Sequence, residues 1–87
     1  MVTTLPNNFF YVYTLVSGVD PRRHYTGITT DLRRRLLEHN NGNCIYTIHC
    51  RPWHIEVAVA FCSEAKARAF EQYLKSGSGR AFARRHF

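Results

Sequence analysis

The sequence predicts an α+β domain in which one small sheet of three strands is flanked by helices. Three stretches have the composition or period of strands: residues 9–16 are aromatic and β-branched, residues 24–27 follow a turn-rich segment, and residues 54–61 alternate in polarity. Two stretches with helical spacing of apolar residues, one after Gly27 and one after Ser63, give the order ββαβα. A short helical tail completes this sandwich of one sheet and its helices.

The length of 87 residues allows one domain with one core, which we place at residues 9–87 after a flexible N-terminal lead-in at residues 1–8. No apolar run approaches the roughly 20 residues that span a bilayer, so no membrane contact is expected. The N-terminus lacks the basic and apolar regions of a signal peptide, which predicts a soluble, cytoplasmic protein. The sequence gives no sign of an obligate protein partner.

The first two strands are expected to pair as an antiparallel hairpin, because residues 17–23 are rich in turn formers. A period of two places four side chains of the first strand on one face: Phe9, Tyr11, Tyr13 and Leu15. After the second strand the chain is expected to turn at Gly27 and enter a basic helix.

This basic helix carries a candidate anion site. Its expected limits are an N-cap at Thr29 or Thr30, with Asp31 in the first turn, and an end at Asn41-Gly42. The apolar stripe holds Leu32, Leu36 and His39, and Arg35 lies on its flank, one turn before His39. A cation at the edge of a core, beside a turn that needs glycine, favours anion binding. Arg34 and Glu38 should form an ordinary pair on the solvent side.

The middle of the chain is less regular. Residues 43–53 have no clear period and are expected to form a connecting loop with some buried aromatic residues. The third strand, at residues 54–61, should direct four apolar side chains to one side: Ile55, Val57, Val59 and Phe61.

A second helix is expected from an N-cap at Ser63 to about Lys75, and the Gly-Ser-Gly stretch at residues 77–79 should end it before an amphipathic turn at residues 80–87. Its apolar arc consists of Ala65, Ala69, Phe70, Tyr73 and Leu74. Glu71 lies just beyond that arc, with Arg68 one turn back and Lys75 one turn on. This carboxylate is either a metal ligand or one member of a surface ion pair.

The charge is strongly positive: twelve Lys and Arg oppose six Asp and Glu, which gives +6. Arginine dominates, and its planar guanidinium suits phosphate recognition. Charge alone is equally compatible with a basic protein that binds no nucleic acid. Three cysteines without a CxxC pair argue against a disulfide framework. A zinc site at Cys44, His49 and Cys50 is disfavoured, because no second pair of ligands accompanies them.

Taken one at a time, the other candidate residues also have two interpretations. The phenols of Tyr13 and Tyr25 either face a common cleft or pack as core aromatics. Arg35 either holds a phosphate or is a solvated helix cation. His39 either assists proton transfer or packs at the end of its helix. The residue types leave each of these alternatives open.

The order and spacing of the set are more informative than its members. Tyr11-Val12-Tyr13, then Tyr25-Thr26-Gly27, then Arg35 and His39 in a helix, then Glu71 in a later helix, together resemble the GIY-YIG nuclease family. The resemblance covers most of the chain and is strongest to the small stand-alone branch. It also includes the stretches at residues 27–32, 51–53 and 70–79. The fold that it implies, a small three-stranded antiparallel sheet flanked by helices, agrees with the elements described above.

The resemblance implies roles for individual residues. Tyr13 and Tyr25 match the two motif tyrosines, and Gly27 matches the motif glycine, where the backbone passes close to the site. Arg35 matches the arginine that contacts the scissile phosphate, and Glu71 matches the carboxylate that holds one divalent cation, Mg²⁺ or Mn²⁺. His39 lies where relatives carry histidine or tyrosine.

Two positions depart from the family pattern. Tyr11 stands in place of the first motif glycine, and Ile28 stands where some relatives have a lysine that helps to deprotonate the neighbouring tyrosine or water. A phenol has an unperturbed pKa near 10, so nearby cations must lower the pKa of Tyr13 or Tyr25 for either to act as a base. Which tyrosine is the base stays open.

The function that follows is a metal-dependent endonuclease that hydrolyses phosphodiester bonds in DNA, with single-stranded or structured DNA compatible with the resemblance. One alternative is a nucleic-acid-binding module without turnover, and another is a small interaction domain whose charge is incidental. Salt-dependent binding to nucleic acid separates the first two from the third. The residues expected to contact nucleic acid are Gly27, Arg33, Arg35, Lys75, Arg80, Arg84 and Arg85.

Overall fold

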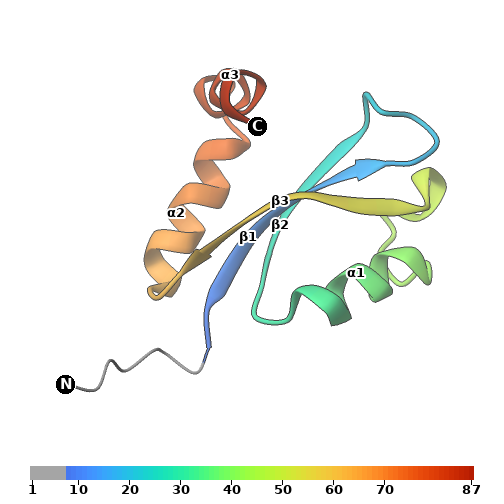
Figure 1. Cartoon of the computed structure of the whole chain (residues 1–87), viewed down its shortest axis with the longest axis horizontal. Helices are drawn as coiled ribbons and strands as arrows, with labels where there is room; N and C mark the ends of the chain where they lie inside the picture. Colours follow the sequence, from blue (N-terminus) through green and yellow to red (C-terminus); the bar gives the residue numbers. More distant parts are fainter. Residues whose placement is uncertain (1–7) are drawn as a thin grey trace.

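The structure, a computed structural model, describes residues 8–87. Three strands form one antiparallel sheet in the order β2-β1-β3: β1 (Phe10–Ser17), β2 (His24–Thr29) and β3 (Trp53–Phe61). The helices are α1 (Leu32–Asn40), the 3-10 helix η1 (Ile48–Cys50), α2 (Glu64–Leu74) and α3 (Gly77–His86) (Figure 1). The predicted α+β class, with the order ββαβα and a helical tail, is confirmed. The predicted lead-in lies, apart from residue 8, outside the described residues.

The sheet has a helical layer on each face, because the side chains of β1 alternate between two apolar clusters. The cluster between the sheet and the pair α2 and α3 contains Val12, Ala67, Leu74, Phe70 and Phe82. The cluster between the sheet and α1 contains Tyr13, Leu15, Trp53, Leu32 and Leu36. Figure 1 shows α1 and α2 on opposite sides of the strands. The two clusters therefore lie on opposite faces of the sheet.

A β-bulge divides β3 into two parts. Thr14 pairs with Val57, but the next residue of β1, Leu15, pairs with Ile55, so Glu56 is an extra residue in β3. The expectation that Ile55 shares a face with Val57 is therefore wrong. Ile55 and Trp53 lie on the α1 face, whereas the larger apolar side chains of the rest of β3, those of Val57, Val59 and Phe61, lie on the α2 face. No sequence pattern marked the extra residue.

The start of α1 differs from the expectation by one or two residues. Asp31, and not Thr29 or Thr30, is the N-cap, and its carboxylate accepts a hydrogen bond from the backbone N–H of Arg34. Gly27 lies inside β2 instead of at a turn. The C-terminal end was predicted correctly, since Asn41 is the C-cap and Gly42 follows with a φ of 82°.

The buried stripe of α2 is also rotated from the predicted arc. Ala67 and Leu74 are buried, whereas Ala65, Ala69 and Tyr73 are exposed. The N-cap at Ser63 and the end near Lys75 agree with the prediction. Within residues 8–87, no helix is both long and apolar enough to cross a membrane.

The Gly-Ser-Gly stretch opens α3 instead of forming a break. Ser76 is the N-cap of α3, and its hydroxyl accepts from the N–H of Gly79. A Cβ atom on Gly79 would collide with the backbone carbonyl of Tyr73 near the end of α2. Glycine is required at residue 79 because the two helices meet there backbone to backbone.

Candidate active site

The centre of the candidate site is the contact between Tyr13 on β1 and Gly27, its partner on β2. A Cβ atom on Gly27 would lie 2.5 Å from the phenolic oxygen of Tyr13 and 2.7 Å from its Cζ atom. The ring of Tyr13 therefore lies across the β2 backbone in space that only glycine leaves free. This explains the glycine by close approach, as the family resemblance implied, and not by a turn.

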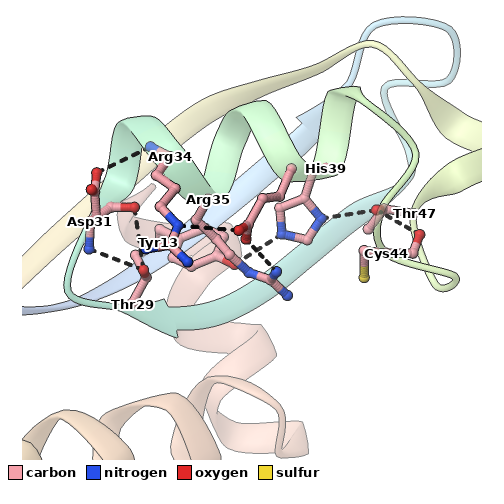
Figure 2. A network of polar contacts seen from close by, with 9 residues as sticks. Tyr13, Thr29, Asp31, Arg34, Arg35, His39, Cys44 and Thr47 are labelled. Atoms are coloured by element: carbon pink, nitrogen blue, oxygen red, sulfur yellow. Dashed lines mark hydrogen bonds and ion pairs between the residues drawn. The ribbon is translucent and has the colours of Figure 1, made fainter.

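A buried chain of hydrogen bonds starts at Tyr13 and ends at a carbonyl (Figure 2). The phenolic oxygen of Tyr13 lies 3.0 Å from Nε2 of His39, and Nδ1 of His39 lies 2.9 Å from Oγ1 of Thr47. The hydroxyl of Thr47 donates to the carbonyl of Cys44 over 3.3 Å. His39 and Thr47 are fully buried, and Tyr13 is 2% exposed.

This chain fixes the tautomer of His39. A carbonyl oxygen only accepts, so the hydroxyl hydrogen of Thr47 belongs to the bond with Cys44. Nδ1 of His39 must then donate to Thr47, and Nε2 carries the lone pair that accepts from the phenol of Tyr13. The arrangement keeps His39 neutral and uses the hydroxyl hydrogen of Tyr13.

The loop after α1 holds Thr47 in place through Trp53. The indole Nε1–H of Trp53 donates to the carbonyl of Thr47 over 2.8 Å. The side chain of Asn40 brackets the backbone of Trp53, accepting from its N–H over 2.6 Å and donating to its carbonyl over 3.1 Å. The loop predicted for residues 43–53 is thus anchored at the start of β3, and it contains η1.

Tyr25 and Arg35 complete the cluster. The ring of Tyr25 packs against that of His39 with 4.8 Å between centroids, and the rings of Tyr13 and Tyr25 are 6.4 Å apart. Arg35, whose side chain is 33% exposed, lies near both phenols and donates to Glu38 over 2.9 Å. Four of the five predicted catalytic residues therefore come together, from β1, β2 and α1.

The electrostatics differ from the expectation for Tyr13. Burial raises the pKa of Tyr13 to about 12, although the guanidinium of Arg35 acts in the opposite direction. The nearby cation therefore does not bring the pKa of this phenol below its ordinary value. Burial also lowers the pKa of His39, and the positive charge of Arg35 adds to that effect. Both shifts agree with the protonated phenol and neutral imidazole of the chain.

A polar hollow of about 210 Å³ lies at the start of α1, beside this cluster. Its lining residues are Thr29, Thr30, Asp31, Arg34, Arg35 and Glu38. Arg34 and Arg35 both bind Glu38, at 3.3 and 2.9 Å, so the predicted Arg34–Glu38 pair is present but shared. Hydrogen bonds from Arg35 hold the pKa of the Glu38 carboxyl below its usual range. In this structure Glu38 thus accepts a hydrogen bond from the Arg35 guanidinium, the group that the family resemblance assigned to a phosphate.

Glu71 is the fifth predicted catalytic residue, and within residues 8–87 no hydrogen bond or ion pair joins it to the other four. It lies on α2, between Ala67 and Leu74 in the stripe that faces the sheet, and its side chain is only 15% exposed. Its ion-pair partner within residues 8–87 is Lys75, at 3.3 Å, whereas Arg68 binds Glu64 instead. The position is more enclosed than the edge of the arc, where the sequence placed it.

The other predicted nucleic-acid contacts are exposed and divide into two groups. Lys75, Arg80 and Arg84 line a second hollow, of about 680 Å³, near the junction of α2 and α3. Arg33 and Arg85 line neither hollow. The three cysteines are free thiols, and within residues 8–87 no group of three or more His, Cys, Asp or Glu side chains is arranged to hold a metal ion.

Sequence reasoning missed Thr47 and Asn40. Both lie in or next to a stretch without a period, and their importance comes from contacts with residues far along the chain. The available signal was that Asn40 and Thr47 have short side chains that form hydrogen bonds and occur near aromatic residues expected to be buried. That signal is common in loops and does not single them out.

Comparisons with known proteins agree with this geometry. Residues 9–85 match the family described as the GIY-YIG catalytic domain. The chain is also 40% identical over 75 residues to "Structure-specific endonuclease subunit SLX1" of Candida dubliniensis, an alignment that covers 78% of this chain and 26% of that protein. The chain therefore spans about a quarter of the length of this relative. No solved structure matches the chain.

Proposed function

Because the chain belongs to the GIY-YIG family of endonucleases, enzymes that hydrolyse phosphodiester bonds, we propose that it cleaves DNA with the help of one divalent cation, Mg²⁺ or Mn²⁺. The observation that carries this proposal is the cluster of Tyr13, Tyr25, His39 and Arg35. It combines a buried hydrogen-bond chain with a half-exposed guanidinium beside a polar hollow.

Arg35 is proposed to bind the scissile phosphate. In the free protein its Nη1 group donates to one oxygen of Glu38, and a phosphate would offer the guanidinium two acceptor oxygens. Exchange of the carboxylate for the phosphate would move little else, because both acceptors approach from the hollow at the start of α1. The charge that develops on the phosphate during hydrolysis would then be stabilised where it forms.

Tyr25 is proposed to hold and deprotonate the attacking water. The hydrogen of Tyr13 is engaged with His39, and the burial that raises its pKa to about 12 disfavours loss of a proton. Tyr25 is less buried, packs on His39 and lies near Arg35. With Ile28 in place of a lysine, Arg35 is the cation that the described residues place near this phenol. Tyr13 and His39 then act as positioning residues.

The residues present fit a divalent cation at Glu71. Mg²⁺ is commonly bound by one or two carboxylates, with water and substrate phosphates as its other ligands, so a single enclosed carboxylate is a suitable donor. When bound, the ion would neutralise charge on the phosphate and on the leaving oxygen. To bind the ion, Glu71 would give up its ion pair with Lys75.

A nucleic-acid-binding module without turnover is the second candidate. The observation that favours it is that Glu71, on α2, has its ion pair with Lys75 and, within residues 8–87, no hydrogen bond or ion pair with the other four residues. The two functions differ in one result: a nicked plasmid or cut oligonucleotide with Mg²⁺ or Mn²⁺ that is absent with EDTA supports the nuclease. Binding without cleavage under all metal conditions supports the module.

The substrate is proposed to be DNA that contains a junction or a single-stranded part, in line with the words "structure-specific" in the relative's name. A panel of single-stranded, duplex, flap and RNA substrates tests this. That relative is called a subunit, so the expectation of no obligate protein partner stays a prediction, to be checked by the mass of the active species. Cytoplasmic location likewise stays a prediction, testable by cell fractionation.

A further inference from the structure

The second hollow, of about 680 Å³, forms a groove on the α2 side of the sheet. Thr14 of β1 and Thr26 of β2, which pair with each other, lie at its floor. Residues of α3 form one wall, and Arg22 and His24, at the connection from β1 to β2, form the other. Figure 1 shows α3 and this connection on the same side of the molecule.

The charges around the groove favour an anion. Glu56 is its only acidic lining residue within the described part of the chain, and it binds His24 at 3.5 Å. Arg80 and Arg84 have no acidic partner among residues 8–87. They are four residues apart on α3, so their guanidinium groups project from one face of the helix. Two neighbouring unpaired cations match successive phosphates of a strand.

An aromatic ring stands beside these cations. Phe87 lines the groove and is 41% exposed, while its ring rests against Phe82 with 5.5 Å between centroids. Proteins that bind single strands combine a basic groove with aromatic side chains on which unpaired bases stack. The bases of a duplex are already stacked on each other and do not present their faces in this way.

We propose that this groove holds a single-stranded segment of DNA next to the point of cleavage. Arg80 and Arg84 would contact its phosphates, and Phe87 would stack against one base. Tyr25 connects the groove to the candidate active site, because it lines the groove and also packs against His39. Lys75, another lining residue, lies one turn after Glu71. The inference rests on the proposed function for its choice of DNA as the ligand.

The test measures binding of the whole chain in EDTA, so that it does not depend on turnover. The fluorescence anisotropy of a labelled poly-dT oligonucleotide and of a blunt duplex is followed at several salt concentrations. Arg80→Ala and Arg84→Ala should each reduce the slope of log affinity against log salt by about 0.7 on the single strand. Arg85→Ala should reduce it less than Arg84→Ala, although the two residues are neighbours on α3. Arg68→Ala, which removes a guanidinium on α2 away from the groove, is the control for charge alone.

The aromatic contact has its own signature. Phe87→Leu keeps an apolar group against Phe82 but removes the stacking surface, so single-strand affinity should fall about fivefold with no change in the salt slope. Thermal unfolding of each variant shows that α3 is retained, and Arg84→Lys, which keeps the charge, should keep the slope.

Two results would overturn the inference: equal losses from Arg84→Ala and Arg85→Ala, or losses on the duplex as large as those on the single strand. The first would show a diffuse charge effect and the second a surface for duplex. If the wild type cleaves DNA but Arg80→Ala and Arg84→Ala leave single-strand binding unchanged, this inference is wrong and the proposed nuclease function stands. If the wild type binds single strands through the groove but never cleaves them, the proposed nuclease function is wrong and the groove as a binding site is supported.

Discussion

Arg35 donates to Glu38 over 2.9 Å, three residues along the same helix, and this ion pair occupies the guanidinium that we assign to the scissile phosphate. The pair is partly exposed, so its own contribution to stability should be small. If Arg35 binds the scissile phosphate as proposed, Glu38 and the phosphate would compete for its Nη1–H group.

The first prediction concerns Arg35 itself. Arg35→Ala should nearly abolish cleavage, and Arg35→Lys should restore little, because an ammonium does not reproduce the two parallel hydrogen bonds of a guanidinium. Initial rates of nicking, with circular dichroism for the fold, check this. Arg34→Ala is the matched control, since Arg34 also binds Glu38 but from the outer side. Near wild-type turnover in Arg35→Lys would show that Arg35 is only a surface charge.

The second prediction separates the two tyrosines. Tyr13→Phe removes the donor to Nε2 of His39 and leaves a buried acceptor unsatisfied, which should cost about 1–3 kcal/mol of unfolding free energy. Tyr25→Phe should leave stability nearly unchanged and remove turnover. Urea denaturation and single-turnover cleavage measure the two effects. Full activity in Tyr25→Phe would indicate that Tyr13, and not Tyr25, is the base.

The third prediction is a loss of stability in acid that depends on His39. Its pKa is lowered in the folded protein, so below the ordinary value of about 6.5 the unfolded chain binds the proton more readily. The unfolding free energy should therefore be fully present above that pH and fall as the pH drops towards the folded pKa. Urea unfolding at a series of pH values measures this, and His39→Gln should give a flatter profile. An equally steep fall in His39→Gln would assign the effect to other groups.

The fourth prediction tests Glu71. Glu71→Ala should fold and bind DNA in EDTA as well as the wild type or better, because one negative charge near the nucleic acid is lost. It should not cleave, and added Mn²⁺ should rescue it poorly. If Glu71 only formed an ion pair with Lys75, it would matter by well under about 1 kcal/mol of stability and not at all for turnover. Wild-type rate and metal dependence in the variant would place the metal elsewhere.

The fifth prediction uses the two glycines at the start of α3. Gly79→Ala should displace α3 or destabilise the protein markedly, because the new methyl group meets the carbonyl of Tyr73. Gly77→Ala is the control, since nothing lies within 4 Å of a Cβ atom there, and it should be neutral or slightly stabilising. Thermal unfolding compares the two. Equal melting temperatures would contradict the close helix junction.

The sequence was sufficient for the class of fold, for the strands and for most helix ends, because these depend on local composition and caps. The apolar run of β1, the N-cap at Ser63 and the Asn41-Gly42 end are such local signals. The rotation of the α2 stripe and the glycine contact at Gly79 were not predictable, because each is set by a partner elsewhere in the chain.

The candidate site divides in the same way. The family resemblance carried by the order of Tyr13, Tyr25, Arg35 and His39 was enough to expect them together, and they are together. The protonation of Tyr13 was not predictable, because it depends on burial and on Thr47, which lies in a stretch without a pattern. The enclosure of Glu71 depends on how α2 is rotated against the sheet.

The bulge at Glu56 determines what the deletion of one residue in β3 would do. Trp53 and Phe61 are an even number of residues apart, and only the extra residue between them lets Trp53 enter one cluster while Phe61 enters the other. A single-codon deletion at this point would turn Trp53 to the opposite face and withdraw its indole from the carbonyl of Thr47. Thr47 would then no longer be held for His39. A change of length in β3, far along the chain from both tyrosines, would therefore disturb the hydrogen bonds that hold His39 beside Tyr13.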